Sequence, residues 1–296
     1  MTKTRLGIIG GSGLYDLKGL EDVRWISVES SFGEPSDELM FGTLAGQELV
    51  FLPRHGRGHK YSPSDINYRA NIDALKRAGV TDILSISAVG SFREELKPGD
   101  FVIVDQYIDR TFAREKSFFG EGLVAHVSLA HPTCESLSDL VEKALKEAGI
   151  SYHRGGTYLA MEGPQFSTIA ESHMYRAWGC DVIGMSNMPE AKLAREAEIC
   201  YCPVVMVTDY DSWHPEHGTV DIQEILNVLS ANVNKGKQLV KVIAPLLAHS
   251  DARHPCSKGC DHALDMAFMT APEQTDRELL AKLSAITARV VREDVK

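Results

Sequence analysis

The stretch 6-LGIIGGSGLYD-16 places an apolar run directly before Gly10, Gly11, Ser12 and Gly13. An apolar run that stops at clustered glycines is typical of a buried β-strand leading into a tight turn. The backbone N–H groups of such a turn can point at an anion. The stretch therefore predicts a strand of a covered sheet, and it raises the question of which phosphate, if any, the turn holds.

Three anion-binding interpretations and one purely structural interpretation compete for this turn. The dinucleotide fingerprint G-x-G-x-x-G fails at its third glycine, where Asp16 stands. A phosphate-binding P-loop fails because no Gly-Lys-Ser/Thr follows. A turn that holds one phosphate, with the Ser12 hydroxyl as a further donor, and a plain strand-to-turn connection without a ligand both stay open.

The composition of the chain excludes several classes of protein. With 296 residues and 44% hydrophobic content, the chain has enough apolar material for a large core. The net charge of -10 argues against a nucleic-acid partner, because such partners need clustered Lys and Arg. Neither a membrane span nor a signal peptide is apparent, so we expect a cytoplasmic protein without a membrane partner. Six cysteines in a chain of this length indicate reduced thiols.

Apolar, β-branched runs alternate with helical patterns along the chain. We expect strands over 5-9, 25-29, 38-44, 47-52, 81-88, 100-108, 156-161, 181-185 and 200-208, with a hairpin turn near Ala45-Gly46. We expect helices over 64-78, 133-148, 168-178, 188-198 and 220-248, the first of them with Ser62 as its N-cap. This alternation predicts an α/β single domain with a central mixed, partly parallel β-sheet flanked by helices.

Polar residues stand where the predicted strands end. Ligands of open α/β sheets bind at the carboxyl ends of strands, and this rule selects Gly11 to Gly13, Arg54 with His55, Ser87 with Ala88, Met185 with Ser186, and Asp209. Arg54 can donate two N–H bonds to a phosphate, although a solvated basic loop is the alternative. His55 and His59 have the i, i+4 spacing of a metal pair, but Gly56 and Gly58 disfavour the helix that this spacing requires.

Two carboxylates close the apolar strand in 203-PVVMVTDYDSWH-214. In an extended strand, the side chains of Asp209 and Asp211 face the same way. Two close carboxylates cannot easily both ionise, so one of them should keep a proton near neutral pH. A metal-binding D-x-D pair and a solvated turn are the alternatives. Phe166, which precedes the helix over 168-178, can stack on a flat base or belong to the core.

These motifs together closely resemble the trimeric purine nucleoside phosphorylase family, in particular its methylthioadenosine-cleaving members. The resemblance extends over residues 5-250 and is carried by IIGGSG, RHGR-x-H, NYRANI, AVGS, PGD-x-VI-x-DQ-x-IDRT, EGP-x-FS, AESHMYR, WG-x-DVIGM and TDYDSW. It implies the nucleoside phosphorylase fold for residues 1-250. It also implies phosphorolysis, in which phosphate attacks C1′ of the sugar while the purine leaves.

The resemblance implies a role for each candidate site residue. The phosphate-binding positions are Ser12, Arg54, His55, Ser87, Ala88 and Ser186. Met185 corresponds to the ribose contact, and Phe166 and Ser167 correspond to the base pocket. Asp209 corresponds to the group that donates a proton or a hydrogen bond toward purine N7, while Asp211 supports it and contacts the exocyclic amine. Ser12, Asp209 and Asp211 are therefore the candidate catalytic residues.

The resemblance implies 5′-methylthioadenosine as the substrate, cleaved to adenine and 5-methylthioribose 1-phosphate in methionine and purine salvage. Aspartates at 209 and 211 favour adenine, and a 6-oxopurine nucleoside or methylthioinosine is the alternative substrate. The 5′ group is expected in an apolar pocket formed by His126 of a neighbouring subunit with Ile222, Ile225 and Leu226. The resemblance also implies inorganic phosphate as a co-substrate, no metal or organic cofactor, and a homotrimer, with a hexamer as the alternative.

Residues 251-296 form a C-terminal loop and helix in this interpretation. The stretch 254-HPCSKGCDH-262 contains two Cys and two His, which could bind zinc, but the C-x3-C spacing and the absence of a second pair count against this. A reduced surface loop is the alternative. In 276-DRELLAKLSAITARVV-291 the apolar positions have helical spacing, which predicts a helix that packs on its own domain or on a trimer neighbour.

Overall fold

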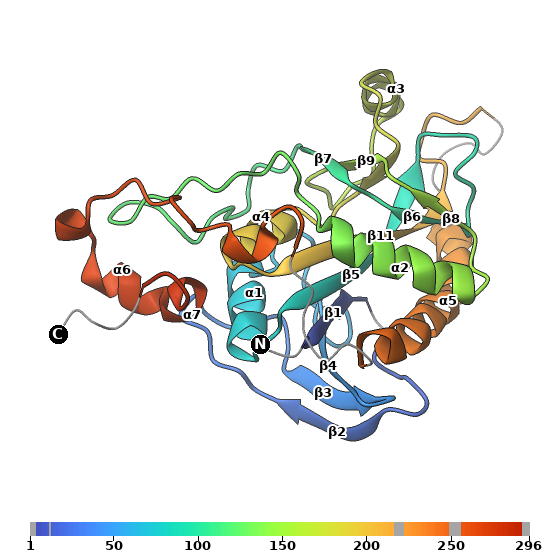
Figure 1. Ribbon diagram of the computed structural model, residues 1–296. Helices are drawn as coiled ribbons and strands as arrows, with labels where there is room; N and C mark the ends of the chain where they lie inside the picture. Colours follow the sequence, from blue (N-terminus) through green and yellow to red (C-terminus); the bar gives the residue numbers. More distant parts are fainter. Residues whose placement is uncertain (1–3, 12, 216–221, 249–255, 292–296) are drawn as a thin grey trace.

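Two long strands, β5 (Asp82–Ser91) and β11 (Cys200–Asp209), run side by side through the middle of the computed structural model (Figure 1). The structure describes residues 4–11, 13–215, 222–248 and 256–291. Every residue of β5 except Ala88, and every residue of β11 except Asp209, is buried. Strands that are apolar at successive positions need a cover on both faces, and the two central strands have it.

The other strands and helices follow the order expected from the sequence, apart from a strand over Tyr152–Arg154 that was not expected. The strands are β1 (Leu6–Gly10), β2 (Glu21–Ile26), β3 (Leu39–Leu44), β4 (Gln47–Pro53), β6 (Phe101–Ile103), β7 (Gln106–Asp109), β8 (Tyr152–Arg154), β9 (Thr157–Ala160) and β10 (Val182–Gly184). The helices are α1 (Tyr68–Arg77), α2 (Glu135–Glu147), α3 (Ile169–Ala177), α4 (Glu190–Glu196), α5 (Ile222–Ala248), α6 (Arg277–Lys282) and α7 (Ser284–Thr287), with short 3-10 turns at Cys260–His262 and Pro272–Gln274.

The described strands form one 11-stranded mixed sheet. β1 lies parallel to β4 and β5, and β5 lies parallel to β11, whereas β10 runs antiparallel to β5 and β6 runs antiparallel to β11. The carboxyl ends of β1, β4, β5 and β11 therefore meet at one edge of the sheet. The prediction of an α/β domain with a central mixed, partly parallel sheet flanked by helices is confirmed.

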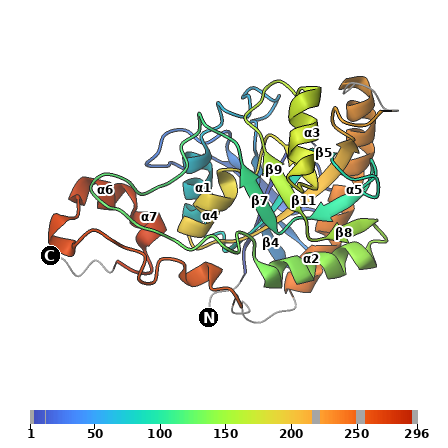
Figure 2. The same cartoon turned by 90° about the horizontal axis from the view of Figure 1, so that it is seen from above.

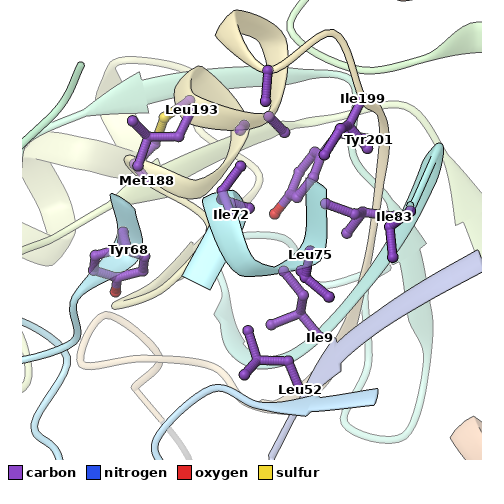
Figure 3. Packing of buried hydrophobic residues seen from close by; sticks show 14 of the residues in the cluster. Ile9, Leu52, Tyr68, Ile72, Leu75, Ile83, Met188, Leu193, Ile199 and Tyr201 are labelled. Carbon is purple, nitrogen blue, oxygen red and sulfur yellow. The ribbon is translucent and has the colours of Figure 1, made fainter. Parts of the chain in front are cut away.

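Alternate residues of the central strands enter two separate apolar clusters. Ile9, Leu52 and Tyr201 pack with α1 and α4 in one cluster, while Ile8 and Phe51 pack with α2 and α5 in the other. Figures 1 and 2 show the two helix pairs on opposite sides of the sheet. Figure 3 shows the first cluster, where strand side chains face Ile72 and Leu75 of α1. The period-2 alternation of the strands thus fixes which helices cover which face.

Several predicted boundaries are wrong. The run 100-108 forms two strands, β6 and β7, which pair with different neighbours. The first helix begins at Tyr68 and is capped by Asn67, whose side chain accepts from the N–H of Ala70, so Ser62 is not its N-cap. The helix expected over 276-291 is two short helices, α6 and α7. The hairpin turn is correct, since Ala45 and Gly46 join β3 to β4 with φ values of 49° and 82°.

The C-terminal segment packs against the helix layer that contains α1 and α4. Leu264, Ala267, Leu283 and Ile286 are buried in the same apolar cluster as Ile72 and Leu193. In Figures 1 and 2, α6 and α7 project beyond α1 at one end of the molecule. Among the helices that the structure describes, none combines the length and the apolar character that crossing a bilayer requires.

Candidate active site

The edge where the parallel strands end gathers the polar residues selected from the sequence. The N–H of Arg54, which follows β4, donates to Gly10 O at the end of β1 over 2.9 Å, and Arg54 Nη1 donates to Ile86 O of β5 over 3.0 Å. Gly90 of β5 lies in register with Asp209 of β11. Three strands thus bring Arg54, Ser87 and Asp209 to one edge, as the rule for α/β sheets predicts. Ser12 lies outside the described residues.

Arg54 is held in a buried ion pair with Glu190, the first residue of α4. Nε and Nη2 donate to the two carboxylate oxygens over 2.9 and 3.1 Å, and the two side chains are 2% and 3% exposed. Nη2 also donates to Ser85 Oγ. Ser85 Oγ and Tyr201 Oη in turn donate to Glu190 Oε1, the oxygen that accepts from Nη2. Among the described residues these bonds use four of the five guanidinium hydrogens, which leaves one on Nη1 for a further acceptor.

Each charge of this pair stabilises the ionised form of the other. Burial acts to raise the pKa of Glu190, but the Arg54 charge and the hydrogen bonds from Arg54, Ser85 and Tyr201 outweigh it and hold the pKa below its ordinary value. The same pairing raises the pKa of Arg54 against the opposing effect of its burial. Both groups therefore stay ionised. Glu190 was not predicted as a site residue, because nothing near it in the sequence marks its partner.

His55 presents a neutral ring to this edge. Its Nδ1 lies 2.9 Å from Tyr61 O. A carbonyl only accepts, so Nδ1 carries the hydrogen and Nε2 is left as an acceptor. Burial, together with the nearby charge of Arg54, lowers the pKa of His55 to about 4. The rings of His55 and His59 are stacked with centroids 4.2 Å apart, in a turn where Gly56 and Gly58 have positive φ.

Hydrogen bonds connect the end of β5 to the turn after β10. Ser87 Oγ donates to Asn187 Oδ1 over 3.0 Å, and Asn187 Nδ2 donates to Tyr107 Oη over 3.1 Å. Asn187 has a φ of 68°, a left-handed conformation that Asn tolerates better than most residues. Ser87 and Ser186 are each 7% exposed, whereas Ala88 and Met185 are half-buried. The turn that carries Ser186 is therefore tied to Ser87 through Asn187.

Asp209 and Asp211 occupy a bend rather than a continuous strand. β11 ends at Asp209, and Asp211 has a φ of 48°, so the two residues do not continue an extended strand. The bend lets the N–H of Asp211 donate to Asp209 Oδ2 over 2.9 Å, while Thr208 Oγ1 donates to Oδ1 over 2.6 Å. Asp211 Oδ2 is buried and accepts no hydrogen bond from the described residues. Burial raises the pKa of Asp209 and of Asp211.

The loop between β9 and α3 carries Phe166 and Ser167. Phe166 is 47% exposed, so it is not part of the core, which was one of its two interpretations. Ser167 is buried, and its carbonyl accepts from Ser212 Oγ over 3.0 Å, which ties the loop to the bend after Asp211. Met185 lies against Gly163 of the same loop, where an added Cβ would come within 2.5 Å of Met185 Sδ. Phe166 and Ser167 thus lie on a loop fastened to the end of β11.

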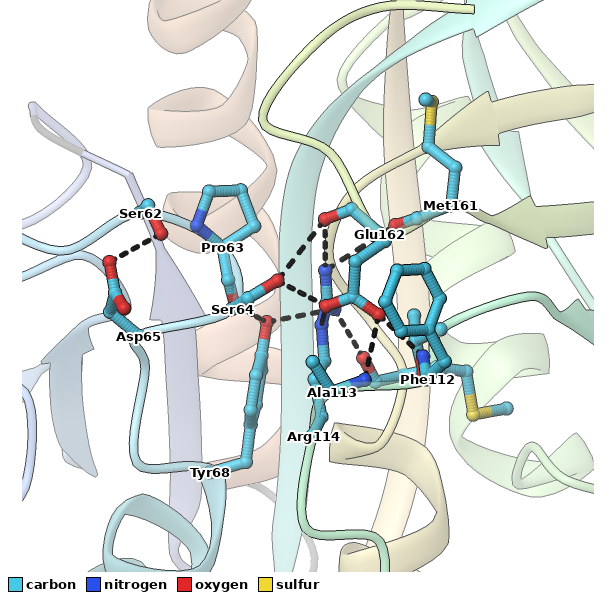
Figure 4. A network of polar contacts seen from close by, with 12 residues as sticks. Ser62, Pro63, Ser64, Asp65, Tyr68, Phe112, Ala113, Arg114, Met161 and Glu162 are labelled. Atoms are coloured by element: carbon cyan, nitrogen blue, oxygen red, sulfur yellow. Dashed lines mark hydrogen bonds and ion pairs between the residues drawn. The ribbon is translucent and has the colours of Figure 1, made fainter.

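Glu162 anchors this loop at its other end, a role that the sequence did not indicate (Figure 4). Its carboxylate accepts from Ser64 Oγ, from the N–H groups of Phe112 and Ala113, and from Arg114 Nε. Burial acts to raise the pKa of Glu162, but these donors lower it below its ordinary value. Arg114 has no exposed side-chain surface. The network connects the loop before α3 to the segment before α1.

His126 lies in a different place from the residues at the strand ends. It lines a cavity of about 380 Å³ together with Lys116, Phe119, Lys192 and Glu196. Burial raises the pKa of Glu196 to about 7, although the Phe118 N–H and the Ser117 hydroxyl act to lower it.

The apolar side chains at the start of α5 are open to solvent. Ile222 and Leu226 are 64% and 51% exposed, and Ile225 is half-buried. They follow residues 216–221, which are outside the described part. The expected apolar pocket combines this turn of α5 with His126 of a neighbouring subunit, so it stays a prediction about the assembly.

Comparisons with known proteins agree with this geometry. Residues 5–244 match the model of the phosphorylase superfamily. The chain is 62% identical over 290 residues to the S-methyl-5′-thioadenosine phosphorylase of Cereibacter sphaeroides, covering 98% of this chain and 99% of the relative. The enzyme of the same name from Rhodospirillum rubrum is 60% identical over 286 residues, covering 97% of each chain.

Solved structures show the same similarity. A crystal structure of a methylthioadenosine phosphorylase from an antarctic soil metagenomic library superposes with a TM-score of 0.90 at 45% identity, covering 97% of this chain and 99% of that one. The methylthioadenosine phosphorylase of Schistosoma mansoni, solved with adenine, gives a TM-score of 0.78 at 35% identity, covering 84% and 93%. The resemblance carried by the sequence motifs is thus confirmed. Matched over most of its length by the family model and by these relatives, the chain belongs to the phosphorylase superfamily.

Proposed function

We propose that the protein cleaves 5′-methylthioadenosine with inorganic phosphate, releasing adenine and 5-methylthio-α-D-ribose 1-phosphate. The observation that carries the proposal is the position of Asp209, a half-buried carboxyl group whose pKa desolvation raises. It closes β11 at the sheet edge where Arg54, Ser87 and Ser186 lie. An acid and a set of anion-binding groups at one edge suit a reaction in which an anion enters as a weakly basic purine leaves.

The anion in this proposal is phosphate. Arg54 offers its remaining Nη1 hydrogen and Ser186 its hydroxyl group, and Ser87 offers its hydroxyl hydrogen by turning it from Asn187 Oδ1 to the phosphate. The neutral His55 ring offers Nε2 as an acceptor for a protonated phosphate oxygen. Ser12 and the N–H of Ala88 complete the proposed cradle, in keeping with the family motifs IIGGSG and AVGS. Glu190 keeps Arg54 in place, so we propose it as a positioning residue.

The purine leaves more readily when its N7 receives a proton or a hydrogen bond. Asp209 is the proposed donor, because its raised pKa keeps the acid form populated at a higher pH than an exposed aspartate would allow. Asp211 supports Asp209 through its N–H, and its unpartnered Oδ2 is available to accept from the exocyclic amine of adenine. Phosphate beneath C1′ stabilises the developing oxocarbenium charge.

The remaining assignments concern the ends of the nucleoside. We propose that Phe166 and Ser167 border the base and that Met185 contacts the ribose, since all three lie on segments fastened near Asp209. For the 5′-methylthio group we propose His126 of a neighbouring subunit with Ile222, Ile225 and Leu226, in a homotrimer or a hexamer located in the cytoplasm. The chemistry as proposed needs no organic cofactor and no catalytic metal. Light scattering of the purified protein tests the assembly.

Adenine release from 5′-methylthioadenosine, measured with and without phosphate, tests the proposal. We expect phosphate-dependent release that methylthioinosine does not match. Asp209→Asn should lower kcat by about 10²–10⁴-fold, the usual contribution of a general acid. Asp139→Asn is the matched control, because that carboxylate is 67% exposed and pairs only with Arg154 among the contacts described. Release without phosphate, or an active Asp209→Asn variant, would contradict the proposal.

A further inference from the structure

Four cysteines from three distant parts of the chain converge beside the start of β11. Cys134 precedes α2, Cys200 is the first residue of β11, and Cys256 and Cys260 belong to the C-terminal segment. Their four sulfur atoms all lie within 4.8 Å of one another. Cys134, Cys200 and Cys260 are at most 3% exposed, and Cys256 is half-buried. The proposed reaction makes no use of this cluster.

We propose that these four thiols bind one zinc ion as a structural site. In a tetrahedral zinc–thiolate site the Zn–S bonds of about 2.3 Å place the sulfur atoms roughly 3.8 Å apart. Two of the separations here are somewhat shorter than that value, with 3.0 Å between Cys256 and Cys260 and 3.6 Å between Cys134 and Cys256, and none exceeds 4.8 Å. Sulfur ligands select zinc over hard cations such as Mg²⁺ or Ca²⁺. On binding, each thiol releases its proton to solvent.

The backbone holds the ligands in position. The N–H of Cys134 donates to Tyr201 O over 2.8 Å, next to Cys200, whose own N–H donates to Thr81 O over 3.1 Å. Gly259, with a φ of 65°, turns the chain between the other two cysteines, and its N–H donates to Cys256 O over 3.0 Å. The C-x3-C spacing that counted against zinc in the sequence is within the range of structural sites. The second pair is formed by Cys134 and Cys200, which only the fold brings together.

A pair of disulfides is the competing state of the same cluster. Two disulfides would separate the sulfur atoms into two bonded pairs, each about 2.05 Å apart. In the structure the six cysteines, all within the described ranges, form no disulfide, and each of the four clustered sulfur atoms lies within 4.8 Å of the other three. A single metal ion bound by all four sulfur atoms accounts for these short separations better than two disulfide bonds do. His262, which the sequence offered as a zinc ligand, instead pairs through Nδ1 with Asp261 over 3.1 Å, and His254 lies outside the described residues.

The zinc site would fasten the C-terminal segment to the body of the domain. Beyond Cys260, the N–H of His126 donates to Ala267 O over 2.9 Å, and the N–H of Met269 donates to Val124 O over 2.8 Å. Val124 and His126 line the 380 Å³ cavity. Loss of the metal should therefore loosen both the segment after Cys256 and the strand-like stretch around His126. This proposal does not rest on the proposed reaction.

Metal analysis of the full-length protein, purified without chelator or histidine tag, tests the site. We expect one equivalent of zinc per chain, released by an organomercurial that blocks thiols. The double variant C256S/C260S should lose the zinc, and Cys180→Ser should retain it, because Cys180 is a buried free thiol outside the cluster. Zinc that persists in C256S/C260S would overturn the assignment.

A second measurement keeps the proposal testable if C256S/C260S does not fold. Wild-type protein stripped with chelator and loaded with Co²⁺ should show the intense visible bands of tetrahedral cobalt–thiolate coordination. Its melting temperature should fall after stripping and recover with Zn²⁺. Purified protein that lacks stoichiometric zinc would overturn the proposal, and a thiol count would show which state the cluster adopts instead. Six titratable thiols after denaturation would indicate an unoccupied cluster, and fewer than six, without added reductant, would indicate disulfides.

Discussion

The Arg54–Glu190 pair allows a quantitative test of how the proposed phosphate site is supported. In Glu190→Gln, the amide cannot balance the Arg54 charge, and its NH₂ group would face an Arg54 N–H as a second donor. Both side chains are at most 3% exposed, so water cannot replace the lost carboxylate. Breaking one partner of a buried pair costs about 3–5 kcal/mol, and we expect that loss in the free energy of unfolding.

A matched control separates burial from charge. Arg5 and Glu48 form an ion pair at 2.8 Å, close to the 2.9 Å of the buried pair, but their side chains are 33% and 54% exposed. Glu48→Gln should therefore cost only about 0.2–1 kcal/mol. Urea unfolding of both variants and the wild type at one protein concentration, followed by circular dichroism, gives the comparison. Equal losses in the two variants would refute the claim that Glu190 holds Arg54 by a buried charge.

Three further predictions concern Glu196, Gly90 and His55. Between pH 4.5 and about 7 folded Glu196 keeps a proton that the unfolded chain has released, so its contribution to stability falls by about 3 kcal/mol as pH rises. Glu196→Gln should remove this pH-dependent loss of stability, which urea unfolding at pH 5 and pH 8 measures. A variant whose urea midpoint shifts between the two pH values as much as that of the wild type would contradict the prediction. In Gly90→Ala the new Cβ would lie 3.0 Å from Asp209 Oδ2 and 3.2 Å from Ile183 Cγ2, so we expect a stability loss of about 1–3 kcal/mol and a lower kcat. A Gly90→Ala variant with unchanged kcat would contradict the prediction that the added Cβ disturbs Asp209. Below its ordinary pKa an exposed histidine is charged, but His55 should stay neutral down to pH 4, which a ¹⁵N NMR titration of its ring can check.

The strands and the residues at their ends could be predicted because their signals are local. β5 and β11 appear as continuous apolar runs, and Arg54 and Asp209 are polar residues directly after such runs. The break between β6 and β7 could not be read in the same way. Val104 is buried like a strand residue, although the N–H of the next residue, Asp105, donates to Gly156 O. The start of α1 was missed because Ser62 bonds to Asp65 rather than to a helix N–H.

The unpredicted parts of the site depend on partners that are distant in sequence. Glu190 lies 136 residues from Arg54, and nothing near either residue shows that they pair. The same holds for Glu162, whose contacts with Arg114 and Ser64 cross 48 and 98 residues. Cys134 and Cys200 gave no signal as ligands, because the first carries no motif and the second begins a strand. A pattern in one sequence marks what a residue can do, and the fold decides what it meets.

The pairing of β5 with β11 has a consequence for how the chain acquires its structure. Thr208 and Val89, which hydrogen-bond across these strands, are 119 residues apart. A nascent chain therefore exposes the apolar β5 along one edge until β11 has been synthesised, and parallel pairing over such a separation is slow. During that interval the unpaired edge can associate with other chains. We therefore expect the yield of active protein to depend on temperature and chain concentration during synthesis, even though β5 is almost wholly buried in the finished sheet.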